Sequence, residues 1–259
     1  MEDFTNATQA FFNDEKFSDL TIVCGTSGKQ FKAHRILASS HSKWFARCCS
    51  GSFAESQSRR IELKDDQPEA LERMIQYFYK FDYDEVPGLV GSKLELHAWM
   101  VVISDKYEIP SFQKVASKRF MQEIKNNIDN PHLLIAAATI IYENLPYQFS
   151  SPSNGGFEDS RLHIALADAW IARGCDHNKN EHFEELTRAL AQKAPAFAAH
   201  IQARVFYTMF ARPVLAECLN CDHKFDLYVA YPTQAHKICP QCNVPEVIFY
   251  RKCIYICED

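Results

Sequence analysis

The alternation of apolar and polar positions is clearest between residues 16 and 83. Residues 20–23 (Leu-Thr-Ile-Val) are apolar and rich in β-branched side chains, which favours a buried strand. Residues 25–28 supply turn chemistry, and a second strand is expected over about 29–33. The whole stretch predicts the order strand, turn, strand, helix, helix, strand, helix.

Helical periodicity begins near residue 42. The predicted helix 42–50 carries Trp44, Phe45 and Cys48 on one side, which is the spacing of a core face. The helix that begins at Pro68 repeats its apolar positions at spacings of three and four, namely Leu71, Met74, Ile75, Phe78 and Tyr79. This face is therefore expected to be buried.

Asp66 is expected to cap the helix from Pro68, with the proline at an early helical position. The helix from Pro110 is expected to bury Phe112, Val115, Phe120 and Ile124. Further helices are predicted over 92–106, 133–142, 157–173, 181–193 and 195–211.

The composition is that of an ordinary globular protein. The 259 residues are 47% hydrophobic and 24% charged, and no apolar run approaches the roughly 18 residues of a membrane span. The net charge of −5 gives no reason to expect nucleic acid or an anionic membrane as a partner. Residues 1–13 contain two acids and no base, the wrong charge for a signal or transit peptide, so a cytoplasmic or nuclear location is expected.

Several motifs occur in an order that resembles a known family. Phe-Lys-Ala-His-Arg at 31–35 precedes Leu-Ala-Ser-Ser at 37–40, and Trp-Phe at 44–45 follows in the next helix. Ile-Glu-Leu at 61–63 precedes a Pro-Glu-Ala-Leu-Glu helix, and Asp-Lys-Tyr-Glu-Ile-Pro at 105–110 ends a later helix. Together these motifs resemble the BTB/POZ domain over about the first 120 residues, and their wording is most similar to the fungal branch.

This resemblance implies an α+β fold in which helices flank a small β-sheet. We expect the BTB/POZ domain over residues 1–127 and a helical extension, similar to that found after many such domains, over 128–212. A small β domain with the features of a zinc ribbon is expected over 213–259. The helical part carries no evident catalytic group and is expected to position the small C-terminal domain.

Asp19 and Arg35 match an acid and a base that lie close together in the family, in a charged pocket at the dimer interface. One interpretation is a pocket for a partner or cofactor, and the other is an ion pair that orders the corner between strand and helix. His34 is expected to be a structural histidine. The phenylalanines of residues 4–17 are expected to pack on the domain or on a second subunit, which leaves a homodimer open.

Phe53-Ala54-Glu55 follows the predicted helix 42–50. It resembles the hydrophobic-x-Glu motif that cullin-binding BTB proteins present in the loop after the corresponding helix. The resemblance implies that Phe53 fills an apolar pocket on the cullin and that Glu55 adds a polar contact. A buried aromatic anchor with a charged rim is typical of a binding hot spot.

Four of the ten cysteines form two C-x-x-C pairs, Cys218 with Cys221 and Cys239 with Cys242, which are separated by 17 residues. This spacing is within the range of structural zinc sites, and four thiolates complete one tetrahedral shell. Segments of β type at 225–230 and 247–250 follow the pairs. The sequence therefore predicts one structural Zn²⁺, which would supply folding free energy to a piece too small for a core of its own.

Alternatives to this site are weaker. His223 or His236 could replace one cysteine, and Cys253 and Cys257 are expected to be core or surface thiols. A zinc deaminase is not expected, because Pro240 lies inside the second cysteine pair and four cysteines leave no open position for water. Residues 213–259 contain four Lys or Arg against six Asp or Glu, a balance that disfavours nucleic acid.

The sequence contains no Gly-rich phosphate loop, no H-E-x-x-H and no G-x-S-x-G, so an enzyme is not expected. The favoured hypothesis is a BTB substrate adaptor of a cullin-RING ubiquitin ligase, in which the helical and zinc segments recruit a client protein. The alternatives are a BTB scaffold that forms homo- or hetero-oligomers without a ligase, and a transcription-associated regulator.

Overall fold

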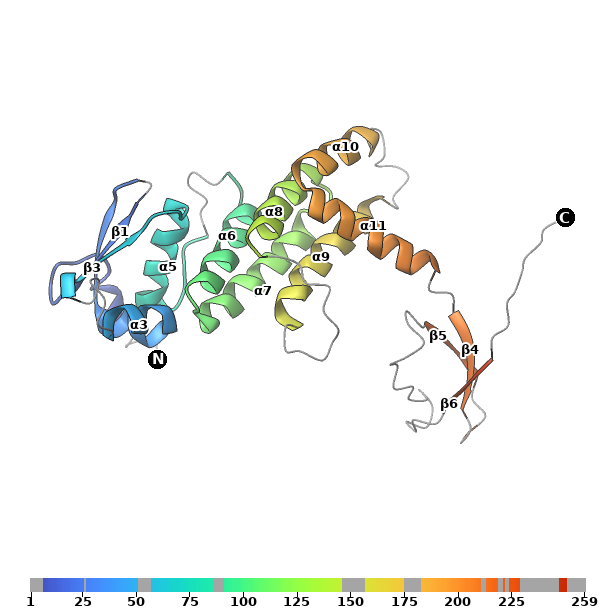
Figure 1. Cartoon of the computed structure of the whole chain (residues 1–259), viewed down its shortest axis with the longest axis horizontal. Helices are drawn as coiled ribbons and strands as arrows, with labels where there is room; N and C mark the ends of the chain where they lie inside the picture. The colour runs from blue at the N-terminus through green and yellow to red at the C-terminus, as the bar shows by residue number, and fades with distance from the viewer. Residues whose placement is uncertain are drawn as a thin grey trace. The chain divides into compact units, whose positions relative to one another are not determined.

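The computed structural model describes residues 7–25, 27–50, 57–85, 91–145, 157–174, 183–210, 213–218, 221, 224–228 and 247–250. The chain divides into two compact units, Met1–Ala198 and Ala199–Asp259. Figure 1 shows the order of their helices and strands. The domain limits predicted at residues 127 and 212 stay predictions.

The first unit contains a three-stranded sheet of order β2-β1-β3, built from β1 (Leu20–Cys24), β2 (Gln30–Ala33) and β3 (Arg60–Leu63). The central strand β1 runs antiparallel to β2 and parallel to β3, with Ile22 opposite both Phe31 and Ile61. All three of these side chains are buried. The two predicted strands are confirmed, and the apolar run at 20–23 reflects a central strand covered by its neighbours.

Gly25 ends β1 where the backbone of β3 comes closest. Its N–H donates to the carbonyl oxygen of Leu63 at 2.8 Å. A Cβ atom at this position would lie 2.7 Å from the Cα of Lys64, so the close approach of the two strands requires glycine.

The helices that accompany this sheet are α2 (Arg35–His41), α3 (Lys43–Ser50), α5 (Pro68–Lys80), α6 (Lys93–Lys106) and α7 (Pro110–Asn126). The apolar face predicted for α5 is confirmed, because Leu71, Met74, Ile75, Phe78 and Tyr79 are all buried. Helix α6 is buried on nearly all sides because it packs against α5, α7 and α8 (Pro131–Asn144).

The prediction that Asp66 caps α5 was wrong. Gln67 is the N-cap, and its side-chain oxygen accepts from the Ala70 N–H at 2.6 Å. The carboxylate of Asp66 instead accepts from the Tyr107 hydroxyl at 2.6 Å and from the Lys106 ammonium at 2.8 Å. Asp66 therefore joins the end of β3 to the end of α6.

Two core positions differ by one residue from their predictions. In α3 the fully covered cysteine is Cys49, whereas Cys48 is half-buried. In α7 the buried stripe contains Ala116 in place of Val115, so that it repeats every fourth residue. In each helix the predicted residue and the buried one are adjacent in the sequence and both are apolar. Helical spacing alone therefore does not decide which of the two is buried.

The first unit continues through α8, α9 (Phe157–Gly174), α10 (Phe183–Lys193) and the first turn of α11 (Pro195–Phe210). Tyr142 of α8 stands edge-on to His163 of α9, with ring centroids 4.6 Å apart, and its ring lies 5.2 Å from that of Phe197. Both histidine and aromatic side chains are therefore used here for packing. None of the described helices is long and apolar enough to cross a membrane.

The second unit contains an antiparallel sheet of order β5-β4-β6, made of β4 (Pro213–Cys218), β5 (Lys224–Tyr228) and β6 (Val247–Tyr250). The β-type segments predicted near 225–230 and at 247–250 are present as β5 and β6. Strand β4 was not predicted, and it is the central strand to which both of the others pair.

Candidate functional site

Asp19 and Arg35 lie at the corner where β2 leads into α2. The Asp19 carboxylate accepts from the backbone N–H of Arg35 at 2.8 Å, and the Arg35 guanidinium donates to the carbonyl oxygen of Cys49. The acid thus faces the N-terminus of α2 and the base faces the last turn of α3, which are the ends that favour those charges. The charged pocket implied by the family stays a prediction.

His34 is hydrogen-bonded within the domain through both ring nitrogens. Its Nε2 lies 3.0 Å from the carbonyl oxygen of Lys16, and its Nδ1 lies 2.8 Å from the Tyr79 hydroxyl. Burial raises the pKa of Tyr79 to about 12, so this phenol remains a donor at neutral pH. The expectation that His34 is structural is confirmed.

Three large hydrophobic side chains are exposed among the described residues: Phe17, Ile36 and Phe81. Phe17 and Ile36 are each 77% exposed. Phe17 lies near His34, because His34 Nε2 is 3.0 Å from the carbonyl oxygen of Lys16 and the ring of Phe11 lies 5.8 Å from His34 and 6.3 Å from Phe17. Ile36 follows His34 by two residues, in the first turn of α2. The N-terminal segment and α2 therefore present apolar side chains to solvent.

Helix α3 leads directly into the segment that carries the predicted cullin motif. Phe53 and Glu55 lie outside the described residues. The helix itself is firmly held, because Phe45 is fully buried with its ring 5.5 Å from that of Phe78. At its start, the Ser42 hydroxyl donates to the carbonyl oxygen of Tyr107 at 2.5 Å, which fixes α3 against the end of α6.

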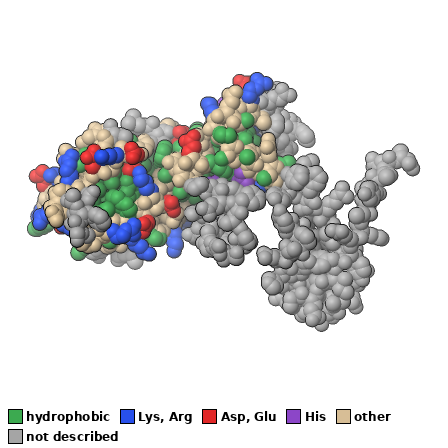
Figure 2. All heavy atoms as spheres, in the orientation of Figure 1, with side chains coloured by type: hydrophobic (Ala, Val, Ile, Leu, Met, Phe, Trp, Pro, Cys, Tyr) green, Lys and Arg blue, Asp and Glu red, His purple; other side chains and the backbone are tan. Residues whose placement is uncertain are grey.

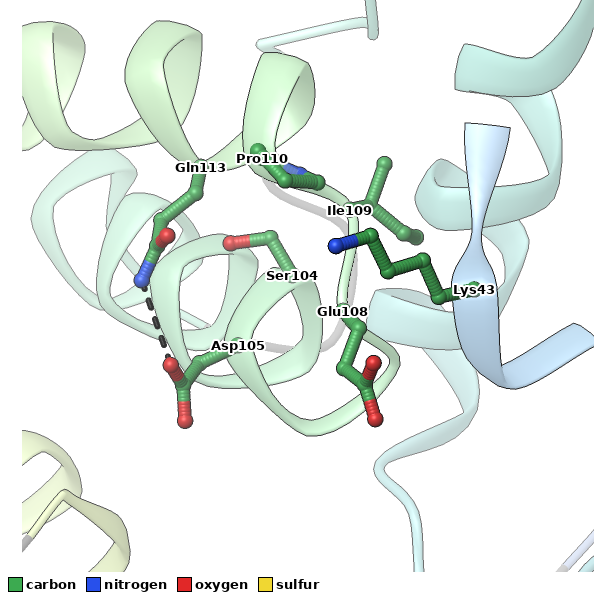
Figure 3. Close-up of a pocket in the computed structure, with 7 residues that line it drawn as sticks. All are labelled: Lys43, Ser104, Asp105, Glu108, Ile109, Pro110 and Gln113. Atoms are coloured by element: carbon green, nitrogen blue, oxygen red, sulfur yellow. Dashed lines mark hydrogen bonds between the residues drawn. The ribbon is translucent and has the colours of Figure 1, made fainter. Parts of the chain in front are cut away.

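A pocket of about 240 Å³ lies between the start of α3 and the corner that joins α6 to α7. Its lining residues are Lys43, Ser104, Asp105, Glu108, Ile109, Pro110 and Gln113 (Figure 3). Glu108 is bound by both terminal nitrogens of the Arg47 guanidinium, and this hydrogen bonding lowers the pKa of the Glu108 carboxyl. The pocket is thus polar on one wall and apolar at Ile109 and Pro110.

The C-terminal sheet brings the described cysteines to one end. Cys218 is the last residue of β4 and pairs with Val247, the first residue of β6. Cys221 lies between β4 and β5 and is exposed. Cys239 and Cys242 lie outside the described residues, as do Cys253 and Cys257. Within the described part of the chain, no group of three or more potential ligand side chains is found.

The face of the first unit shown in Figure 2 carries Lys, Arg, Asp and Glu side chains interspersed around a group of hydrophobic ones. Neither positively nor negatively charged side chains predominate on the described part of that face. Such a mixture fits a protein partner better than a polyanion, because nucleic acid needs clustered positive charge.

Comparison with known proteins identifies the class of the first domain. Residues 8–124 match the BTB/POZ domain family. The chain is 27% identical to human Kelch-like protein 30 over 127 residues, which are 48% of this chain and 20% of the relative. It is 32% identical to human Kelch-like protein 11 over 87 residues (31% and 12%), and 25% identical to BTB and MATH domain-containing protein 40 of Caenorhabditis elegans over 116 residues (42% and 27%). The chain therefore spans about a quarter or less of the length of these relatives.

Among solved structures, the BTB domain of zebrafish PATZ1 aligns with 46% of this chain and 86% of its own, at 14% identity and a TM-score of 0.35. Residues 8–124 are a BTB/POZ domain, which is a protein-interaction module. The prediction of this domain from the sequence motifs is confirmed. Membership of the fungal branch, the family character of the helical extension and the zinc ribbon stay predictions.

Proposed function

We propose that the chain is a substrate adaptor of a cullin-RING ubiquitin ligase, in which Phe53 and Glu55 dock the cullin and the later segments recruit a client protein. The observation that carries the proposal is the BTB/POZ domain with a hydrophobic-x-Glu sequence directly after α3. In this resemblance the aromatic side chain enters an apolar pocket on the cullin and the acid adds a polar contact.

The packing of α3 supports this assignment. Phe45 anchors the middle of the helix in the core, and Ser42 ties its start to Tyr107. A rigid helix next to the docking residues lowers the entropy that binding must offset. The mixed charge of the face in Figure 2 also suits a protein partner.

Co-purification tests the adaptor hypothesis. The intact chain, tagged and expressed in its native cell, is expected to bring down a cullin, and Phe53→Ala combined with Glu55→Ala is expected to abolish it. The matched control is Phe81→Ala, which removes an exposed aromatic side chain from a different loop. Absence of any cullin with the unaltered chain would refute the adaptor hypothesis.

A second candidate function is assembly with another copy of the chain, and the exposure of Phe17 and Ile36 favours it. Each of these side chains is 77% exposed and would lose apolar surface to water-free contact if a second copy covered it. Light scattering after gel filtration is expected to give twice the chain mass, and Ile36→Asp is expected to return it to 29.8 kDa. A monomer at every concentration would exclude this assembly.

We further propose that one structural Zn²⁺ is held by Cys218, Cys221, Cys239 and Cys242. The register of the second sheet supports this set of ligands, because the last residues of β4 and the first residues of β5 and β6 lie at the same end of the sheet. Val247, the residue that pairs with Cys218, follows Cys242 by five residues, so the chain holds Cys242 within roughly 17 Å of Val247, at about 3.4 Å per residue. The ion would hold two loops together and contribute folding free energy.

Metal analysis of the purified chain tests this site without reference to ligase activity. One zinc per chain is expected, and Cys239→Ser is expected to lose it. Cys48→Ser, at a half-buried thiol of α3, is the control that should keep it. A chain purified with zinc present that retains none would contradict the zinc site while leaving the adaptor hypothesis untouched.

A further inference from the structure

We draw no further inference here: the strongest candidate, the side of the β5-β4-β6 sheet on which the strand register gathers the apolar residues Val214, Ala216 and Cys218 with their apolar partners in β5 and β6, carries none because nothing in the described part of the chain shows what covers it.

Discussion

The substitution Tyr79→Phe removes one buried hydroxyl group. It tests how much the hydrogen bonds of His34, which link Tyr79 of α5 to Lys16 of the N-terminal segment, stabilise the domain. The Tyr79 hydroxyl accepts from the backbone N–H of His34 at 3.1 Å and lies 2.8 Å from His34 Nδ1. Because Nε2 faces the carbonyl oxygen of Lys16, Nε2 carries the proton and Nδ1 is the acceptor for the phenol. A single buried oxygen therefore serves two groups of His34.

The expected cost follows from this count. Phenylalanine keeps the packing of the fully buried ring but leaves the His34 N–H and Nδ1 without their partner. An unsatisfied buried polar group costs about 1–3 kcal/mol, so the two together predict a loss of about 2–6 kcal/mol in the free energy of unfolding. His34 is 9% exposed, which places the value in the lower half of that range.

Urea unfolding followed by tryptophan fluorescence measures this loss. Tyr77→Phe is the matched control from the same helix, because Tyr77 is also buried but its hydroxyl is hydrogen-bonded to the side chain of Ser111, an exposed residue. The control is expected to lose less than about 1 kcal/mol. If Tyr79→Phe were no more destabilising than Tyr77→Phe, the hydrogen bonds between Tyr79 and His34 would not stabilise the domain as predicted.

Two further stability predictions concern α6. Burial lowers the pKa of His97 to about 4, so the folded chain binds fewer protons than the unfolded chain between pH 6.5 and 4, and stability falls as the pH falls through this range by at most about 3 kcal/mol. His97→Gln is expected to flatten this dependence in urea unfolding at pH 7 and pH 5, whereas His132→Gln, at an exposed position, should reproduce the original slope. Tyr107→Phe is expected to cost about 1.5–3 kcal/mol, because its hydroxyl donates to the buried Asp66 carboxylate, and Lys106→Ala, at a 47% exposed side chain, less than about 1 kcal/mol. Equal effects of the last two in thermal unfolding would contradict the assignment of Asp66.

The parts of the fold that sequence reasoning predicted correctly are those in which the pattern has one solution. The apolar run of β1 and the regular stripe of α5 are specified by their own periods. The outcome for Asp66 could not be predicted locally, because Tyr107, 41 residues later, competes for the carboxylate that would otherwise cap α5.

The second sheet shows a different difficulty. Strand β4 begins at Pro213 and ends at Cys218, the first cysteine of the predicted zinc site. Its six residues are too short a pattern to distinguish a strand from a helical segment by periodicity alone. The central position of β4 in the sheet depends on its pairing with distant segments, because β6 begins almost thirty residues after β4 ends. The pocket at Lys43 was also missed, because its residues come from three elements whose arrangement no local pattern specifies.

Direct binding of a purified cullin by this chain, measured by isothermal titration calorimetry, tests the central claim that the BTB/POZ domain works by docking a ligase. The adaptor hypothesis predicts a saturable one-to-one complex that Phe53→Ala with Glu55→Ala weakens by at least about thirtyfold, with Phe81→Ala equal to the unaltered chain. No measurable heat of binding with the unaltered chain, or the same affinity in the double variant, would contradict it.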